Sequence, residues 1–206
     1  MTSLITALGL GLLIGAQHTF EPDHLAAIAT MLPDESSTRR AAARGAWWGL
    51  GHGLSIAAIG LPLILLGLRV PEHLESTAEF VVALMLIGLG VHAFWRATRP
   101  RSEAARRSVM KTTLPVGLIH GLAGSGAAVV LATTQSDSPR TALVFLTVFV
   151  LGSIASMTLA AVLLAMPLER LAARPALMPW LLRTSGVLSA AVGLVWGGPL
   201  LMSWIG

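Results

Sequence analysis

Two histidines and two carboxylates lie within seven residues of a segment that is otherwise almost entirely apolar. Residues 18–24 read H-T-F-E-P-D-H, and residues 4–32 carry no charged side chain outside this stretch. An ionisable side chain near the centre of a bilayer costs about 2.5 kcal/mol or more. The cluster therefore indicates a role that needs these groups together.

Imidazole and carboxylate are ligands for divalent transition metals. Nickel, cobalt, zinc and copper(II) accept imidazole nitrogen, whereas magnesium and calcium prefer oxygen ligands. On an unbroken helix His18 and His24 would lie about 120° apart, too far around the axis to face one ion. The sequence therefore predicts which metals the site can bind. It also means that the helix must be broken or bent if both histidines are to face one ion.

Pro22 supplies that change. A proline inside a helix lacks the N–H donor, and its ring clashes with the carbonyl four residues earlier, here that of His18. We therefore predict a helix break between His18 and Pro22, with a second half-helix that carries Asp23 in its positive first turn. A cation held by the freed carbonyl, the imidazoles and the carboxylate would satisfy all of these groups.

Two further histidines, His52 and His120, lie at the same predicted depth as His24. His24 lies eight residues from Leu32, at the end of its run, while His52 lies eight from Arg44 and His120 nine from Lys111, or roughly 12 Å along a helix in each case. His52 and His120 each follow a glycine by three positions and precede another directly, a spacing that favours close helix packing. The expected metal ligands are His18, Asp23, His24, His52 and His120, with Glu21 as an accessory ligand, a proton acceptor or a helix cap.

The composition indicates a membrane protein. The chain has 206 residues, of which 54% are hydrophobic and 12% charged, and its mean hydropathy is +0.76, too apolar for a soluble domain of this length. It contains no cysteine, which excludes thiolate metal sites and disulfide exchange. The expected partners are a divalent metal ion and membrane lipid, with no nucleic acid and no permanently bound cofactor.

Apolar runs long enough to cross a bilayer predict an all-α polytopic membrane protein with six transmembrane helices in a single domain, residues 1–206. The pattern G-x-x-H-G occurs in the second and fourth runs, which suggests a 3+3 inverted repeat of residues 1–97 and 114–206 joined by a basic cytoplasmic loop, 98–113. Aligning the second run with the fifth places Ser153 at the position of His52. The six runs are 4–32, 46–68, 78–97, 114–134, 141–167 and 180–205.

Basic residues predict the orientation. Twelve fall in or beside the first, third and fifth loops, and only Arg69 and Arg140 fall on the other side. The positive-inside rule then predicts that these loops lie in the cytoplasm and that both termini lie on the outer side of the cytoplasmic membrane. Trp47, Trp48 and Trp95 are expected at the cytoplasmic interface. The residues Glu72, His73, Glu75 and Glu79 are expected in a solvated external loop. The twelve basic residues are Arg39, Arg40, Arg44, Arg96, Arg99, Arg101, Arg106, Arg107, Lys111, Arg170, Arg174 and Arg183.

The first run, G-A-Q-H-T-F-E-P-D-H-L-A-A-I, resembles the signature helix of the nickel/cobalt transporter superfamily, especially its small urease-accessory-type nickel permeases. L-G-H-G around His52 and L-I-H-G-L-A-G-S-G from Leu118 extend the resemblance over most of the chain. It implies a secondary permease, not an enzyme, that takes up Ni²⁺ or Co²⁺ without ATP and in which His18, Asp23 and His24 are essential. The chain departs from eight-span members by lacking their extra first helix.

Other interpretations stay open. Ser125 lies between glycines, and with a histidine as base it would suit an intramembrane serine protease, although no histidine follows it in the chain. A metal or oxyanion exporter on the same scaffold would differ only in direction or ligand. No G-x-x-x-x-G-K-[ST] motif occurs, so the chain encodes no ATPase subunit. Import against export, nickel against cobalt, and a homo-oligomeric state are left open.

Overall fold

The computed structural model describes residues 4–34, 37–98, 109–171 and 176–205, and these form seven α-helices, one short 3-10 turn and no strand. The helix bounds follow the predicted apolar runs, and the second to sixth runs are extended at their N-terminal ends by two to eight residues, because loop residues continue the same backbone hydrogen bonds. The elements are α1 (Leu4–His18), α2 (Pro22–Met31), η1 (Leu32–Asp34), α3 (Thr38–Leu66), α4 (Glu72–Arg96), α6 (Val109–Thr134), α7 (Pro139–Leu171) and α8 (Met178–Ile205).

Five helices are long and apolar enough to cross a membrane, namely α3, α4, α6, α7 and α8. The pair α1 and α2 passes the same test only when it is counted as one span, and it is bent by 55° at a short break. The predicted all-helical, membrane-type architecture is thus shown, with five candidate spans, or up to six if the bent pair is counted as one.

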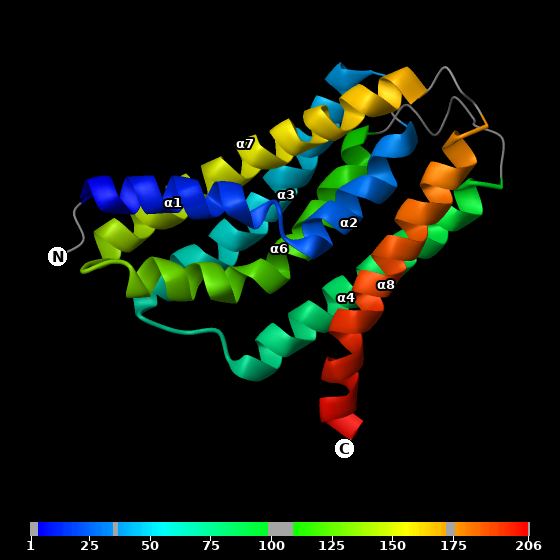
Figure 1. The fold of residues 1–206 in the computed structure, drawn as a ribbon. Coiled ribbons are helices and arrows are strands. Elements are labelled where there is room, and N and C mark those ends of the chain that lie inside the picture. Colours follow the sequence, from blue (N-terminus) through cyan, green and yellow to red (C-terminus); the bar gives the residue numbers. More distant parts are fainter. Residues whose placement is uncertain (1–3, 35–36, 99–108, 172–175, 206) are drawn as a thin grey trace.

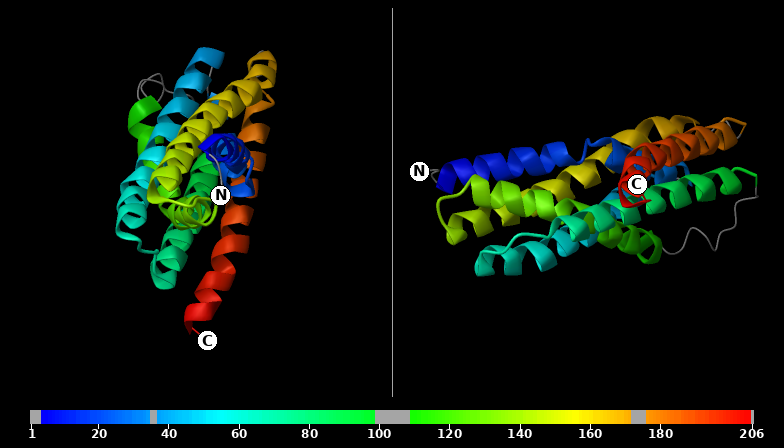
Figure 2. Two further views of the ribbon diagram at one scale, coloured as in Figure 1. Left: turned by 90° about the vertical axis from the view of Figure 1, so that its left-hand side faces the viewer. Right: turned by 90° about the horizontal axis from the view of Figure 1, so that it is seen from below.

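The helices form two groups. In Figures 1 and 2, α1, α3, α6 and α7 lie together in one bundle, while α8 runs beside α4 and ends with the C-terminus clear of that bundle. The half-helix α2 contacts both α4 and α8. It therefore links the bundle to the α4–α8 pair.

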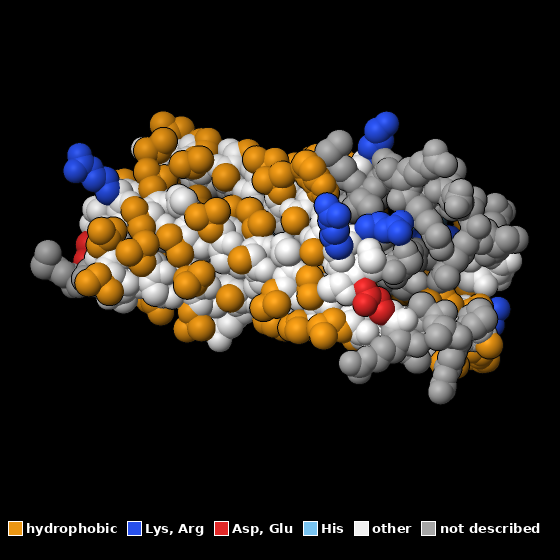
Figure 3. Space-filling view, turned by 90° about the horizontal axis from the view of Figure 1, so that it is seen from above, with side chains coloured by type: hydrophobic (Ala, Val, Ile, Leu, Met, Phe, Trp, Pro, Cys, Tyr) orange, Lys and Arg blue, Asp and Glu red, His pale blue; other side chains and the backbone are white. Residues whose placement is uncertain are grey.

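The outer face over α1 and α7 is apolar. Figure 3 shows hydrophobic side chains along this face and basic side chains toward its ends. Ile5, Leu12, Leu151 and Leu159 are all more than half exposed, as expected for side chains that face lipid. Ten residues of the predicted basic loop, 99–108, lie outside the described residues, and so does Arg174.

Glycines allow α1 to lie directly against α7. A methyl group added at Gly11 would come within 2.8 Å of the Phe145 carbonyl oxygen, and one added at Gly15 would collide with the backbone of Phe149. Small residues at this spacing let two membrane helices approach closely. The contact holds the C-terminal end of α1, which carries His18, against the bundle.

The same arrangement recurs between α6 and α3. A methyl group at Gly117 would collide with the backbone of Trp48, and one at Gly121 with the backbone of His52. Each Gly-x-x-x-Gly helix thus packs on the second helix of the other half of the chain. This pairing matches His52 with Phe149, one helical turn from the sequence alignment that matched it with Ser153.

We expect Gly117→Ala to destabilise the protein. The added methyl group has no space against the α3 backbone, and overpacking of this kind costs about 1–3 kcal/mol, more than the roughly 1 kcal/mol that alanine gains over glycine in a helix. The unfolding temperature of the purified protein should fall. Gly88→Ala in α4, where no atom lies within 4 Å of the added carbon, is the matched control, and equal unfolding temperatures for the two variants would contradict the proposed packing.

Candidate metal centre

The predicted helix break is confirmed. The helix α1 ends at His18, Glu21 has an extended backbone (φ −63°, ψ 146°), and α2 begins with Pro22 at its first position. Asp23 lies in the first turn of α2, where the positive end of the helix dipole stabilises its negative charge. The proline therefore turns the chain so that residues on both sides of the break face one region.

The backbone of the break is largely self-satisfied. The His18 carbonyl accepts a hydrogen bond from the Glu21 N–H at 3.2 Å, and the Gln17 carbonyl accepts one from the Phe20 N–H at 2.9 Å. The Ser153 hydroxyl of α7 donates to the Gly15 carbonyl at 3.0 Å. The expectation that the break leaves the His18 carbonyl without a donor is thus wrong, because the turn itself supplies one.

Four imidazoles meet at the break. The ring centroid of His24 lies 4.4 Å from that of His18, 5.1 Å from that of His52 and 4.2 Å from that of His120. His24, His52 and His120 are at most 1% exposed, while the side chain of His18 is 12% exposed. The structure therefore brings all four histidines of the predicted set together from α1, α2, α3 and α6.

Asp23 joins two of these imidazoles. Its Oδ1 lies 2.9 Å from His24 Nδ1 and its Oδ2 lies 2.7 Å from His120 Nε2. Since an ionised carboxylate only accepts hydrogen bonds, each of the two ring nitrogens donates to it. The carboxylate, which is 4% exposed, thereby fixes the orientation of both rings.

Glu21 lies at the more exposed edge of the cluster. His18 Nδ1 donates to Glu21 Oε1 at 2.8 Å, and the Glu21 side chain makes no capping hydrogen bond to α2. The interpretation of Glu21 as a helix cap is therefore wrong. The reason is that the His18 ring lies within reach and offers a stronger polar contact than the first-turn N–H groups.

Three buried ring nitrogens have no hydrogen-bond partner within the described part of the chain: His24 Nε2, His52 Nδ1 and His120 Nδ1. Buried polar atoms are nearly always paired, so unpaired ones call for an explanation. Two overlapping groups of side chains have potential ligand atoms within 4.8 Å of one another: His18, His24 and His52, and Asp23, His24 and His120. Neutral imidazole nitrogens and a carboxylate at this spacing can ligate a divalent transition metal.

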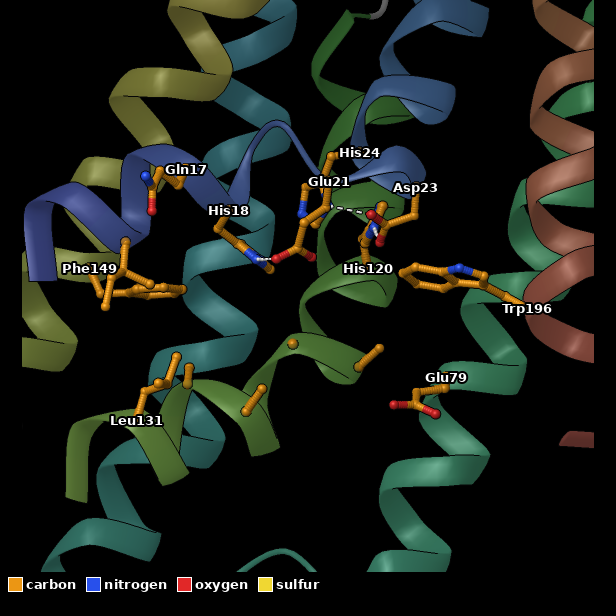
Figure 4. Close-up of a pocket in the computed structure, with 15 residues that line it drawn as sticks. Gln17, His18, Glu21, Asp23, His24, Glu79, His120, Leu131, Phe149 and Trp196 are labelled. Atoms are coloured by element: carbon orange, nitrogen blue, oxygen red, sulfur yellow. Dashed lines mark hydrogen bonds and ion pairs between the residues drawn. The ribbon is translucent and has the colours of Figure 1, made fainter. Parts of the chain in front are cut away.

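A cavity of about 320 Å³ reaches the cluster from one side. Figure 4 shows His18, Glu21, Asp23 and His120 grouped along one wall, with the Glu79 carboxylate of α4 across from them. The cavity is therefore lined by polar groups, among them two of the buried rings, His24 and His120.

Two residues of this region were not recognised from the sequence. Trp48, expected at the membrane interface, is fully buried with its ring 5.6 Å from His24 and 5.7 Å from His120. The expectation of a loop for Glu72, His73, Glu75 and Glu79 is wrong, because all four belong to α4, and Glu79 lines the cavity. The spacing of four between Trp48 and His52, which puts both on one helix face, was the available signal.

The fold and the site together define the class of protein: an all-helical membrane-type protein with a buried site built from imidazole and carboxylate. Against known proteins, the chain is similar to the urease accessory protein UreH of Bacillus sp. (strain TB-90), with 25% identity over 205 residues that cover 93% of this chain and 90% of the relative.

The chain is also similar to two Arabidopsis thaliana proteins, chloroplast proteins FOR GROWTH AND FERTILITY 2 and 1. Each is 29% identical, over 172 and 175 residues that cover 76% and 74% of this chain. The chain spans just under half the length of these two relatives, 46% and 48%. No family model matches the chain, and no solved structure is significantly similar to it.

Proposed function

We propose that the protein is a secondary permease that carries a divalent transition metal ion, Ni²⁺ or Co²⁺, into the cell across the cytoplasmic membrane. The observation that carries the proposal is the buried cluster of four imidazoles and one carboxylate at the break of α1 and α2, in which three ring nitrogens have no described partner. Such groups are expensive in a membrane interior and mark ion pathways.

Two other observations support this function. The resemblance of residues 18–24 to the signature of nickel/cobalt transporters implies nickel or cobalt as the substrate. The relative that aligns with nearly the whole chain is a urease accessory protein, in agreement with the permease type that the signature resembles.

The packing of the two halves supports alternating access. The contacts of α1 with α7 and of α6 with α3 correspond to each other when the chain is divided into three spans plus three. The contacts of α2 with α8 and of α6 with α4 correspond in the same way. An inverted repeat of this kind places a substrate site near the midplane, where rocking of one half against the other exposes it to each side in turn.

The purified protein in liposomes tests the proposal. We expect ⁶³Ni²⁺ to accumulate in proteoliposomes well above the level in protein-free liposomes, and excess Co²⁺ to compete while excess Mg²⁺ does not, since Mg²⁺ prefers oxygen ligands. Proton gradients of either sign then reveal the direction and the coupling. Absence of metal flux under every gradient would reject the proposal, and flux only out of the compartment that corresponds to the cytoplasm would assign an exporter.

Ser125→Ala should leave ⁶³Ni²⁺ uptake within about two-fold of the parent protein. The Ser125 hydroxyl donates to the Leu122 carbonyl of its own helix at 2.7 Å, and hydroxyls bonded to their own helix make small net contributions of about 1 kcal/mol or less. The geometry does not favour the protease alternative, because no described histidine hydrogen-bonds to Ser125. Cleavage of a membrane substrate that is lost in Ser125→Ala, with uptake unchanged, would restore that alternative.

A further inference from the structure

We propose that the cluster holds the ion at two adjacent positions that share His24, and that the ion passes from one to the other. The first position is formed by His18, His24 and His52, and the second by Asp23, His24 and His120. The inference rests on the proposed function and adds that the side chains act as two ligand groups. Sequence reasoning had placed all five in one ligand set.

The spacing at the first position fits two ligands of one ion. His18 Nε2 lies 3.1 Å from His52 Nε2. Metal–imidazole bonds of about 2.0–2.1 Å put neighbouring ligand atoms of one ion roughly 3 Å apart. In addition, Glu21 accepts from His18 Nδ1, the carboxylate–histidine arrangement that orients metal-binding imidazoles and raises their basicity.

The second position contains the buried carboxylate. Asp23 contacts His24 Nδ1 at 2.9 Å through one oxygen and His120 Nε2 at 2.7 Å through the other. When an ion binds at these two nitrogens, each neutral ring carries its N–H proton on the other nitrogen, His24 Nε2 or His120 Nδ1, which has no described partner, and the same three side chains become the ligands of the ion. The ligand set at this position is therefore two nitrogens and oxygen, rather than three nitrogens.

His24 is the only residue common to both groups. Its Nδ1 faces Asp23, while its Nε2 is buried and has no partner in the described residues. The two nitrogens of one imidazole are distinct and point away from each other, so a single ion binds only one of them. The five side chains form two overlapping groups in this structure rather than one, and two positions use both nitrogens of the shared ring.

The two positions follow the broken helix. His18 is the last residue of α1, and Asp23 lies in the first turn of α2. The cavity is lined by His18 and also by Asp23, His24 and His120 of the second position, but not by His52. An ion that moves from the first position to the second therefore crosses the break, from the end of one half-helix to the start of the next.

Co²⁺ binding to the purified full-length protein tests this inference, because its absorption and X-ray absorption spectra report ligand type. With His120→Ala we expect bound Co²⁺ with nitrogen as the only protein ligand, and with His52→Ala bound Co²⁺ with a carboxylate oxygen in the set. His24→Ala should weaken Co²⁺ binding more than either. His92→Ala, in α4 beside Trp95, is the matched control and should behave like the parent.

Measurements of ⁶³Ni²⁺ uptake distinguish a failure of this inference from a failure of the proposed function. His52→Ala and His120→Ala should each lower ⁶³Ni²⁺ uptake by at least about 10-fold, because loss of even an outer-shell partner costs about 10–100-fold, although each still binds Co²⁺. No flux by the parent would reject the function itself. Flux by the parent together with identical Co²⁺ ligand sets in the two variants would overturn only the two-position inference.

One further outcome would also overturn it. If His52→Ala binds no Co²⁺ while His120→Ala has the spectrum of the parent, Asp23 and His120 merely orient His24, and there is one position. Should an alanine variant fail to fold, His52→Gln and His120→Gln retain a polar side chain of similar size, and the same spectra are compared for them.

Discussion

Metal uptake is expected to fall by at least about 100-fold when His24 is replaced by alanine. The ring of His24 lies within about 5 Å of the rings of His18, His52 and His120 and contacts Asp23. Loss of an outer-shell partner of a metal ligand already costs about 10–100-fold, so loss of the central ring should cost more. The measurement is ⁶³Ni²⁺ uptake by cells that express each variant at the same level.

His92→Ala provides the control for this experiment. It removes one imidazole from a membrane helix, but His92 contacts Trp95 and no residue of the cluster. Uptake equal to that of the parent in His24→Ala would reject the assignment of the cluster as the transport site. A loss of uptake in both variants would show that the assay responds to any histidine substitution, in contradiction to the specific effect predicted.

The second large effect is expected for Asp23→Asn, with uptake lowered about 10- to 100-fold. Asparagine keeps the shape of aspartate but has one acceptor oxygen, so one of the two N–H groups, of His24 or of His120, meets an amide nitrogen that donates as well. Both ring orientations then lose their common anchor. The measurement is again ⁶³Ni²⁺ uptake, with its apparent metal affinity.

Asp137→Asn tests whether the effect belongs to the site. Asp137 lies between α6 and α7, so its substitution removes one negative charge elsewhere in the chain. Its uptake should match that of the parent within about two-fold. Equal uptake by the parent and Asp23→Asn would mean that neither the charge of Asp23 nor its double contact is needed.

The local part of the site could be predicted from sequence. Pro22 breaks a helix through its own ring and its missing N–H, whatever surrounds it, and the break between His18 and Pro22 follows. The proximity of His52 and His120 to His24 could be predicted too, because an α-helix rises a constant 1.5 Å per residue and their spacing put all three at one level. These two rules are properties of the chain and do not depend on the packing of the other helices.

The other features of the site could not be predicted, because they depend on how the helices rotate and tilt against each other. Trp48 appeared interfacial because arginines lie near it in sequence, yet α3 turns it toward His24 and His120. Glu79 lies inside the predicted run 78–97 but was grouped with the acidic residues before it, and these too belong to α4, which begins at Glu72. The repeat alignment differed by one turn because glycine, alanine and leucine recur with nearly the period of a helical turn, so a shift of four residues leaves the pattern almost unchanged.

The cavity that ends at buried rings has a consequence for the ion's hydration shell. Its volume of about 320 Å³ is far larger than the roughly 30 Å³ share of one water molecule, so an ion can enter it with water attached. His52 is fully buried beyond the cavity wall, and an ion reaches it only by exchanging water for imidazole. Ions such as Mg²⁺ that give up water reluctantly and gain little from nitrogen ligands would stop in the cavity. The protein would thus distinguish transition metals from Mg²⁺ at the step where water is exchanged for imidazole.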